Sequence, residues 1–301
     1  MAAVAANNCC FQVSSAKPKV YSVPILDEPP KPSLSLRSHA VRISETFSCL
    51  RSQGKVAFIP YITAGDPDLS TTEKALKLLN YRGADIIELG LPFSNPRLDG
   101  HVIQVLISSQ VPIFPLQVIP QISSPIVIFA YYNLILQHDV EWFFSALEDA
   151  GAKGLMVPDL PFEESATLKK VPAKKNIDLV VLLSTPSAAK EQLKAIADAS
   201  EGFIYLASSS GVTGARATVN TQVEFLLKDI KEETAKPVAV GFGISKPEHI
   251  KQISSWGADG VVVGSAIVEL LGKAKFAEEG WNDVESFVAS LRAALPICGK
   301  N

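Results

Sequence analysis

Long apolar segments, clustered cysteines and an excess of basic residues are all missing from this sequence. Its 301 residues include four cysteines, spread as an adjacent pair, Cys9 and Cys10, and two distant single residues, Cys49 and Cys298. This spacing predicts neither a disulfide framework nor a zinc site. No run approaches the roughly 20 apolar residues that span a bilayer, so we expect no membrane partner. The net charge of −3 provides no basic face, so we expect no nucleic-acid partner.

The first 40 residues differ in composition from the rest. They are rich in Ala, Ser, Pro and Lys and show no sustained hydrophobic periodicity. The composition fits an organelle transit peptide, although Asp27 and Glu28 are unusual in one, and it fits a disordered tail equally well. We therefore expect a leader at 1–40 and one folded domain at 41–301.

Eight short β-type runs alternate with amphipathic helical patterns from Val56 onward. Uniformly apolar runs of this length are typical of parallel strands covered on both faces. Ser70–Glu73 reads as a capping box at the start of one helix, and Ser245 with Pro247 marks the start of another. The pattern predicts an α/β fold, a (β/α)₈ TIM barrel, with a doubly wound open sheet as the alternative. The eight runs are 56–65, 85–91, 126–131, 154–160, 178–184, 203–209, 237–244 and 260–267.

Two carboxylates mark the most informative stretch, residues 83–100. Glu88 interrupts the apolar run Asp85–Leu91, and Asp99 ends the loop that follows. An ionisable group inside a strand buried on both faces costs several kcal/mol unless it is paired or used. The pair suggests acid–base catalysis, and the alternative is that Glu88 is a core acid satisfied by its neighbours.

Glycine-rich loops follow the last three predicted strands, at 208–215, 241–245 and 263–266. In TIM barrels the loops after strands seven and eight commonly hold a phosphate against backbone N–H groups. We therefore expect Gly243, Gly264 and Ser265 to approach an anion, although ordinary tight turns explain each loop taken singly.

Aromatic side chains lie near several predicted strand ends. They suit a planar ring on the substrate, or else simply pack. These side chains are Tyr61, Phe129, Tyr131 and Tyr205.

Several kinds of catalysis lack their essential groups. Lysines occur only at predicted strand starts, at Lys55, Lys153 and Lys236, so a Schiff-base nucleophile is missing. No dinucleotide fingerprint is present, and the four histidines are too scattered for a metal-dependent lyase. We read His249, within a predicted helix, as solvated. Carboxylate chemistry on a small phosphate ester, without cofactor or metal, remains.

The motifs together resemble the tryptophan synthase alpha subunit in its plant form, over about residues 42 to 295. They are PYITAGDPD (60–68), DIIELGLPFSNPRLDG (85–100), VPDLPFEES (157–165), SGVTGA (210–215), GFGISKPEH (241–249) and GADGVVVGSAIV (257–268).

The resemblance implies a TIM-barrel lyase of the chloroplast that has no cofactor of its own. Its reaction is the cleavage of indole-3-glycerol phosphate to indole and glyceraldehyde 3-phosphate, and its partner is a tryptophan synthase beta subunit. By motif, Glu88 is the catalytic acid–base, and Asp99 is the second catalytic acid, near the ring N–H. Thr213 lies in the lid loop after strand six. The implied phosphate contacts are Gly214, Gly243, Gly264 and Ser265.

Three departures from the family pattern stand out. Asn95 replaces an acid that the family associates with communication to the beta subunit, and Ser209 replaces a basic residue. Residues 102–124 contain three prolines, so the helix after strand two is expected to be shortened or disrupted. These changes leave open a stand-alone indole-releasing lyase of defence metabolism, or a weakly active or non-catalytic regulatory subunit.

Overall fold

The computed structural model divides the chain into residues 1–39 and residues 40–301. It describes residues 41–92, 116–137, 139–171, 175–183, 190–208, 219–274 and 278–296, all within the second unit.

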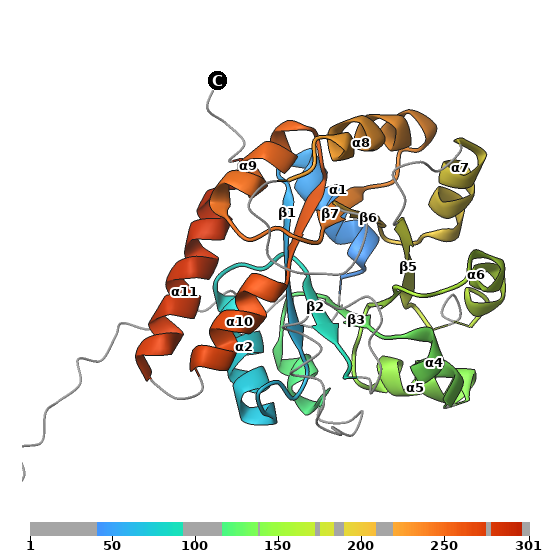
Figure 1. Ribbon diagram of the computed structural model, residues 1–301. Coiled ribbons are helices and arrows are strands. Elements are labelled where there is room, and N and C mark those ends of the chain that lie inside the picture. The colour runs from blue at the N-terminus through green and yellow to red at the C-terminus, as the bar shows by residue number, and fades with distance from the viewer. Residues whose placement is uncertain are drawn as a thin grey trace, which may run out of the picture. The chain divides into compact units, whose positions relative to one another are not determined.

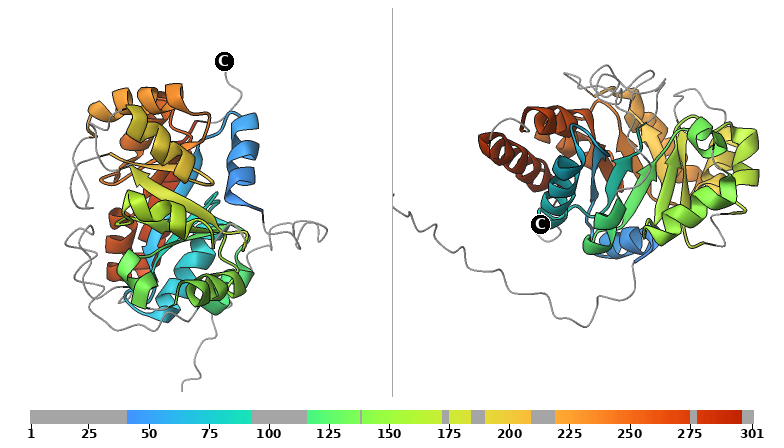
Figure 2. Two further views of the ribbon diagram at one scale, coloured as in Figure 1. Left: turned by 90° about the vertical axis from the view of Figure 1, so that its right-hand side faces the viewer. Right: turned by 90° about the horizontal axis from the view of Figure 1, so that it is seen from below.

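Eight parallel strands close into a barrel in chain order, and β8 pairs back to β1 through Ala57 and Gly260 (Figures 1 and 2). The predicted barrel is confirmed, and the open-sheet alternative is wrong. All eight predicted runs contain a strand, trimmed by a few residues at the ends. The strands are β1 Ala57–Thr63, β2 Ile87–Gly90, β3 Ile126–Phe129, β4 Gly154–Val157, β5 Asp178–Leu183, β6 Ile204–Ala207, β7 Val238–Gly241 and β8 Gly260–Val263.

Helices surround the barrel on its outside (Figure 2). Between β2 and β3 the described residues contain one 3-10 helix, η2 Leu116–Gln121. The segment expected to hold a shortened or disrupted helix is 102–124, and its first part, 102–115, lies outside the described residues. The helices are α1 Ile43–Ser52, α2 Leu69–Tyr81, α4 Tyr132–Gln137, α5 Val140–Asp149, α6 Phe162–Leu168, α7 Lys190–Ala199, α8 Gln222–Glu233, α9 Pro247–Ser255, α10 Ser265–Ala274 and α11 Glu278–Ala293.

The start of α2 differs from the sequence prediction. Asp68, in an extended conformation, is the N-cap, and its carboxylate accepts a hydrogen bond of 2.7 Å from the Thr71 N–H. The predicted capping box at Ser70–Glu73 is therefore wrong by two residues. An aspartate side chain satisfies the free N–H groups of a first turn as well as serine does, so the chain takes the earlier cap.

Alternate residues of each strand point to opposite faces, and this alternation separates two apolar clusters. On β1, Ile59 and Tyr61 belong to an inner cluster inside the barrel, while Phe58 and Ile62 belong to an outer cluster beneath the helices. The same division holds at β2, where Ile86, just before the strand, is inner and Ile87 and Leu89 are outer.

Helix α1 closes the amino end of the barrel. Its buried residues Ile43, Phe47 and Leu50 join the inner cluster, and the Phe47 ring lies 5.3 Å from the Phe203 ring, centroid to centroid. Arg42, just before the helix, pairs with the buried carboxylate of Asp178 at 2.9 Å. The carboxyl end of the barrel is therefore the end left for chemistry, as in other barrels of this type.

Gly154, at the start of β4, makes room for α1. A Cβ there would lie 2.4 Å from Ile43 Cδ1, 3.2 Å from the Asp178 carbonyl oxygen and 3.3 Å from Val127 Cγ2. We expect Gly154→Ala to lower the free energy of unfolding by about 1–3 kcal/mol, because overpacking forces Ile43 to move. Ile43→Val removes the clashing methyl and alone costs about 0.5–1.5 kcal/mol.

Urea unfolding of both single variants and the double variant measures the coupling. The double variant should lose less stability than the sum of the single losses. Additive losses would contradict this packing of α1.

Candidate active site

Glu88 lies on the inner face of β2, because its neighbours Ile87 and Leu89 face the outer cluster and Ile86 faces the inner one. It is buried, with 2% of its surface exposed. The register places it opposite Tyr61 of β1 and Val127 of β3. The predicted acid therefore enters the barrel one layer above Ile86, toward the carboxyl end of the strand.

The four predicted aromatic residues are all buried and all belong to the inner cluster. Tyr61 meets Phe129 edge to face at 5.6 Å, and Phe129 meets Tyr131 in the same manner at 5.9 Å. Tyr205 lies across on β6. These rings line the interior of the barrel at the level of Glu88 and above it, which fits the predicted slot for a planar ring.

Two tyrosines are seated over glycines of the next strand. A Cβ at Gly90 would lie 2.2 Å from the Tyr61 Oη, and a Cβ at Gly241 would lie 2.3 Å from the Tyr205 Oη. Gly264 approaches the other side of Tyr61, since a Cβ there would lie 3.3 Å from Tyr61 Cδ1. Tyr61 therefore connects the acid on β2 with the glycine predicted to contact phosphate on β8.

The loops after β7 and β8 carry the remaining described candidates. Gly264 precedes α10, whose first residue is Ser265, and the Gly264 carbonyl accepts the Ile267 N–H at 2.8 Å. The N–H groups at the very start of a helix have no acceptor within the helix, which favours an anion at this position. Gly243 follows β7 with φ of 71°.

Phe242 is a site residue that the sequence reasoning missed. It has φ of 68°, a conformation uncommon for any residue except glycine, and its ring packs against the inner cluster 5.5 Å from Tyr205. A phenylalanine between two glycines, near the end of the predicted run 237–244, was the available signal.

Three predicted site residues, Asp99, Thr213 and Gly214, lie outside the described residues. The structure thus brings together Glu88, the four aromatic residues and Gly264, with Gly243 and Ser265 on adjoining loops.

His249 is buried, with 4% of its surface exposed, so its assignment as a solvated residue is wrong. It lies in the first turn of α9, and its Nδ1 accepts the Ser245 N–H at 3.3 Å. The helical periodicity places it on the buried side of α9 with Ile250 and Ile253, which belong to the outer cluster. It shapes the loop that carries Gly243.

Charged groups with shifted pKa values lie mainly at the amino end of the barrel. Burial raises the pKa of the Asp85 carboxyl, opposed by the Phe58 N–H at 2.8 Å and by Arg292 at 2.9 Å. Burial also lowers the pKa of the Lys236 ammonium, which donates to the Ser200 carbonyl at 2.8 Å. These groups tie the starts of strands to helices, at the end of the barrel opposite to the predicted site.

At the carboxyl end, Tyr132 opens α4. Its N–H donates to the Asp159 carboxylate at 2.7 Å, and burial together with the Glu164 charge raises the pKa of its hydroxyl. The hydroxyl therefore stays protonated over the ordinary pH range.

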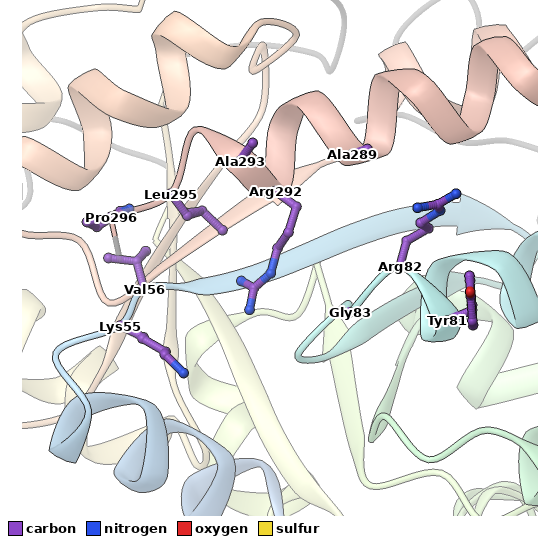
Figure 3. A pocket seen from close by; sticks show the side chains of 10 residues that line it. All are labelled: Lys55, Val56, Tyr81, Arg82, Gly83, Ala289, Arg292, Ala293, Leu295 and Pro296. Atoms are coloured by element: carbon purple, nitrogen blue, oxygen red, sulfur yellow. The ribbon is translucent and has the colours of Figure 1, made fainter. Parts of the chain in front are cut away.

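A cleft of about 650 Å³ lies at the amino end, between α11, the residues just before β1 and the end of α2 (Figure 3). Figure 3 shows Arg292 between Lys55 on one side and Arg82 on the other. Arg292 is paired with Asp85, and Arg82 is paired with Glu285. The cleft is thus separate from Glu88, and two of its three cations are neutralised within the chain.

Within the described ranges, no group of three or more metal-ligating side chains is found, and no helix is long and apolar enough to cross a membrane.

A sequence model of the family described as "Tryptophan synthase alpha chain" matches residues 47–296. The chain belongs to the tryptophan synthase alpha chain family. This confirms the resemblance read from the motifs.

Individual tryptophan synthase relatives agree with the family match. The chain is 54% identical over 272 residues to the tryptophan synthase alpha chain of Arabidopsis thaliana, covering 87% of this chain and 98% of that one. It is 47% identical to the alpha chain of Rippkaea orientalis over 262 residues, covering 84% and 97%.

Solved tryptophan synthase structures share the fold. A structure of tryptophan synthase from Mycobacterium tuberculosis matches with a TM-score of 0.77 and 31% identity, covering 87% of this chain and all of that one. The mutant tryptophan synthase alpha-subunit of Pyrococcus furiosus matches with a TM-score of 0.70 and 34% identity, covering 79% and 98%.

Proposed function

We propose that this chain catalyses the tryptophan synthase alpha reaction, the retro-aldol cleavage of indole-3-glycerol phosphate to indole and glyceraldehyde 3-phosphate, in tryptophan biosynthesis. The observation that carries the proposal is Glu88, a buried acid on the inner face of β2 in a ring-lined barrel, in a chain of this family. The reported relatives are named tryptophan synthase alpha chains, which favours the biosynthetic role over a stand-alone indole-releasing lyase.

The chemistry requires a proton at the indole carbon that carries the side chain. We assign this proton transfer to Glu88. Glu88 gives its proton to that carbon, and a base takes the proton from the hydroxyl on the adjacent side-chain carbon. The carbon–carbon bond then breaks, its electron pair returns to the ring, and an aldehyde and free indole are left. We assign to Asp99 the stabilisation of the positive charge that develops at the ring N–H. A carboxylate aimed at developing charge in a site closed to water is an effective form of transition-state stabilisation.

The aromatic walls and the glycine loops account for the two ends of this substrate. Tyr61, Phe129, Tyr131 and Tyr205 offer faces and edges to the indole ring. Gly243, Gly264 and Ser265 offer backbone N–H groups to the phosphate, with Gly214 and Thr213 assigned to the same end by motif.

Glu88→Gln should lower kcat by about 10²–10⁴-fold, because the amide keeps the shape of the side chain and cannot transfer the proton. Steady-state assay of indole release measures the effect, and unfolding in urea confirms that the variant is folded. Unchanged turnover in a folded Glu88→Gln protein would remove the acid–base role of this residue.

Gly264→Asp should raise KM for the phosphate ester by about tenfold or more, because the new carboxylate repels the substrate phosphate. A repulsion of roughly 1.4 kcal/mol corresponds to a factor of ten. Gly264→Ala is the matched control, because its Cβ makes the same 3.3 Å approach to Tyr61 without adding a charge. If the two variants have equal KM values, Gly264 does not contact the phosphate.

A tryptophan synthase beta subunit is the proposed partner. Leu136 lies on the short helix α4 after β3, at the carboxyl end of the barrel, and 54% of its surface is exposed. A partner that takes up indole has to dock at this end, and an exposed apolar side chain favours such a contact. We expect added beta subunit to stimulate indole-3-glycerol phosphate cleavage. Leu136→Asp should reduce this stimulation and leave the turnover of the isolated chain unchanged.

Phe225→Asp on α8 is the control for that substitution, since Phe225 is also exposed, at 66%. A wild-type chain with substantial turnover that is indifferent to the beta subunit would favour the stand-alone lyase. A chain that binds the beta subunit and cleaves no substrate would favour a regulatory subunit.

The chloroplast stroma is the proposed location, with residues 1–40 as the transit peptide. The similarity to a plant alpha chain and the composition of this leader support it. Residues 1–40 fused to a fluorescent protein should direct it into chloroplasts. Fluorescence confined to the cytosol would contradict this location.

A further inference from the structure

Two hydrogen bonds from one residue tie the end of β6 to the loop after β7. The Ser208 N–H donates to the Gly241 carbonyl at 2.8 Å, continuing the strand pairing, and the Ser208 hydroxyl donates to the Phe242 carbonyl. Ser208 is buried, with 4% of its surface exposed, so water does not readily replace it as the partner of that carbonyl.

The residue that this hydroxyl holds has an unfavourable backbone. Phe242 has φ of 68°, and Gly243 follows with φ of 71°. A phenylalanine keeps a left-handed conformation only when its surroundings fix it, and such residues concentrate at functional sites. Here the described contacts that fix it are the bond from Ser208 to its carbonyl and the packing of its ring.

The ring of Phe242 is directed by this backbone toward Tyr205. The two rings lie 5.5 Å apart with 43° between their planes. Tyr205 is held in turn by the close fit of its hydroxyl over Gly241, where a Cβ has no room. Gly241 and Phe242 therefore both pack against Tyr205, and the Ser208 hydroxyl holds the carbonyl of Phe242.

We infer that Ser208 is a positioning residue for the cleavage reaction: its hydroxyl holds the Phe242 backbone so that the Phe242 ring, with Tyr205, forms one wall for the indole ring of the substrate. Ser208 acts through Phe242 and does not touch the substrate itself. This inference rests on the proposed function, since it assigns the indole moiety to the slot between these rings.

Substitutions at Ser208 test the inference. Ser208→Ala removes the hydroxyl and should weaken indole binding and lower kcat/KM by about tenfold, the size expected for one buried hydrogen bond. Ser208→Thr keeps the hydroxyl and should restore both to within about threefold. Ser200→Ala is the matched control, because Ser200 is a fully buried serine at the amino end of the barrel, and it should change neither quantity.

A double-mutant cycle with Phe242→Leu separates positioning from general stability. If Ser208 acts through the Phe242 ring, adding Ser208→Ala to the Phe242→Leu variant should lower the indole affinity by less than about twofold. Equilibrium dialysis with indole gives the affinities without requiring turnover, and urea unfolding shows which variants are folded.

The outcomes divide clearly. Wild-type indole affinity in Ser208→Ala, equal losses in Ser208→Ala and Ser200→Ala, or multiplicative losses in the double variant would each overturn the inference while leaving the proposed function intact. A wild-type protein that neither cleaves indole-3-glycerol phosphate nor binds indole would overturn the proposed function, and this inference with it.

Discussion

The register of the closed barrel decides which side chains meet inside it. In β2, residues 88 and 90 face inward, as Ile86 does just before the strand, because Ile87 and Leu89 are held in the outer cluster beneath the helices. A shift of one residue would place Glu88 among apolar helix side chains and bring two leucine-sized groups into the barrel. Both changes are costly, since a buried carboxyl needs partners and the interior has little spare volume. The position of the acid is therefore a consequence of the packing of the whole sheet.

Large rings inside a narrow barrel require small neighbours, and the glycines follow from this requirement. Tyr61 and Tyr205 occupy equivalent situations on β1 and β6, and each reaches over a glycine on the next strand. The strand register shows that the two arrangements are equivalent. Gly90 is opposite Thr63, two residues after Tyr61, and Gly241 is opposite Ala207, two residues after Tyr205. A glycine at a strand end thus leaves room for a neighbouring ring and also lets the backbone approach an anion. Gly264 combines both roles, because it packs closely against Tyr61 and is proposed to contact the phosphate.

Charged groups are divided between the two ends of the barrel according to their role. At the amino end, Asp85 pairs with Arg292 and Asp178 pairs with Arg42, and both acids have cationic partners from a neighbouring segment. These pairs join chain segments that are distant in sequence and leave little free charge. At the other end, Glu88 is buried on the inner face of the barrel, the face that also carries the four aromatic residues. The amino end therefore holds the fold together, while the carboxyl end is left for chemistry.

The sequence predicted those parts of the structure that periodicity and motif determine, and missed those that depend on contacts between loops. Eight apolar runs separated by helical patterns were enough for the barrel, and one acid in such a run was enough to place Glu88. The buried state of His249 was missed because a polar side chain was expected to be solvated, although its spacing of four residues from Ile253 places it on the apolar face of the helix. Phe242 was missed for a related reason: its left-handed backbone depends on Ser208, more than 30 residues earlier, and on a ring from another strand. Pairings of this kind become visible only when the strands are assembled, since neither partner differs from an ordinary residue in its own segment.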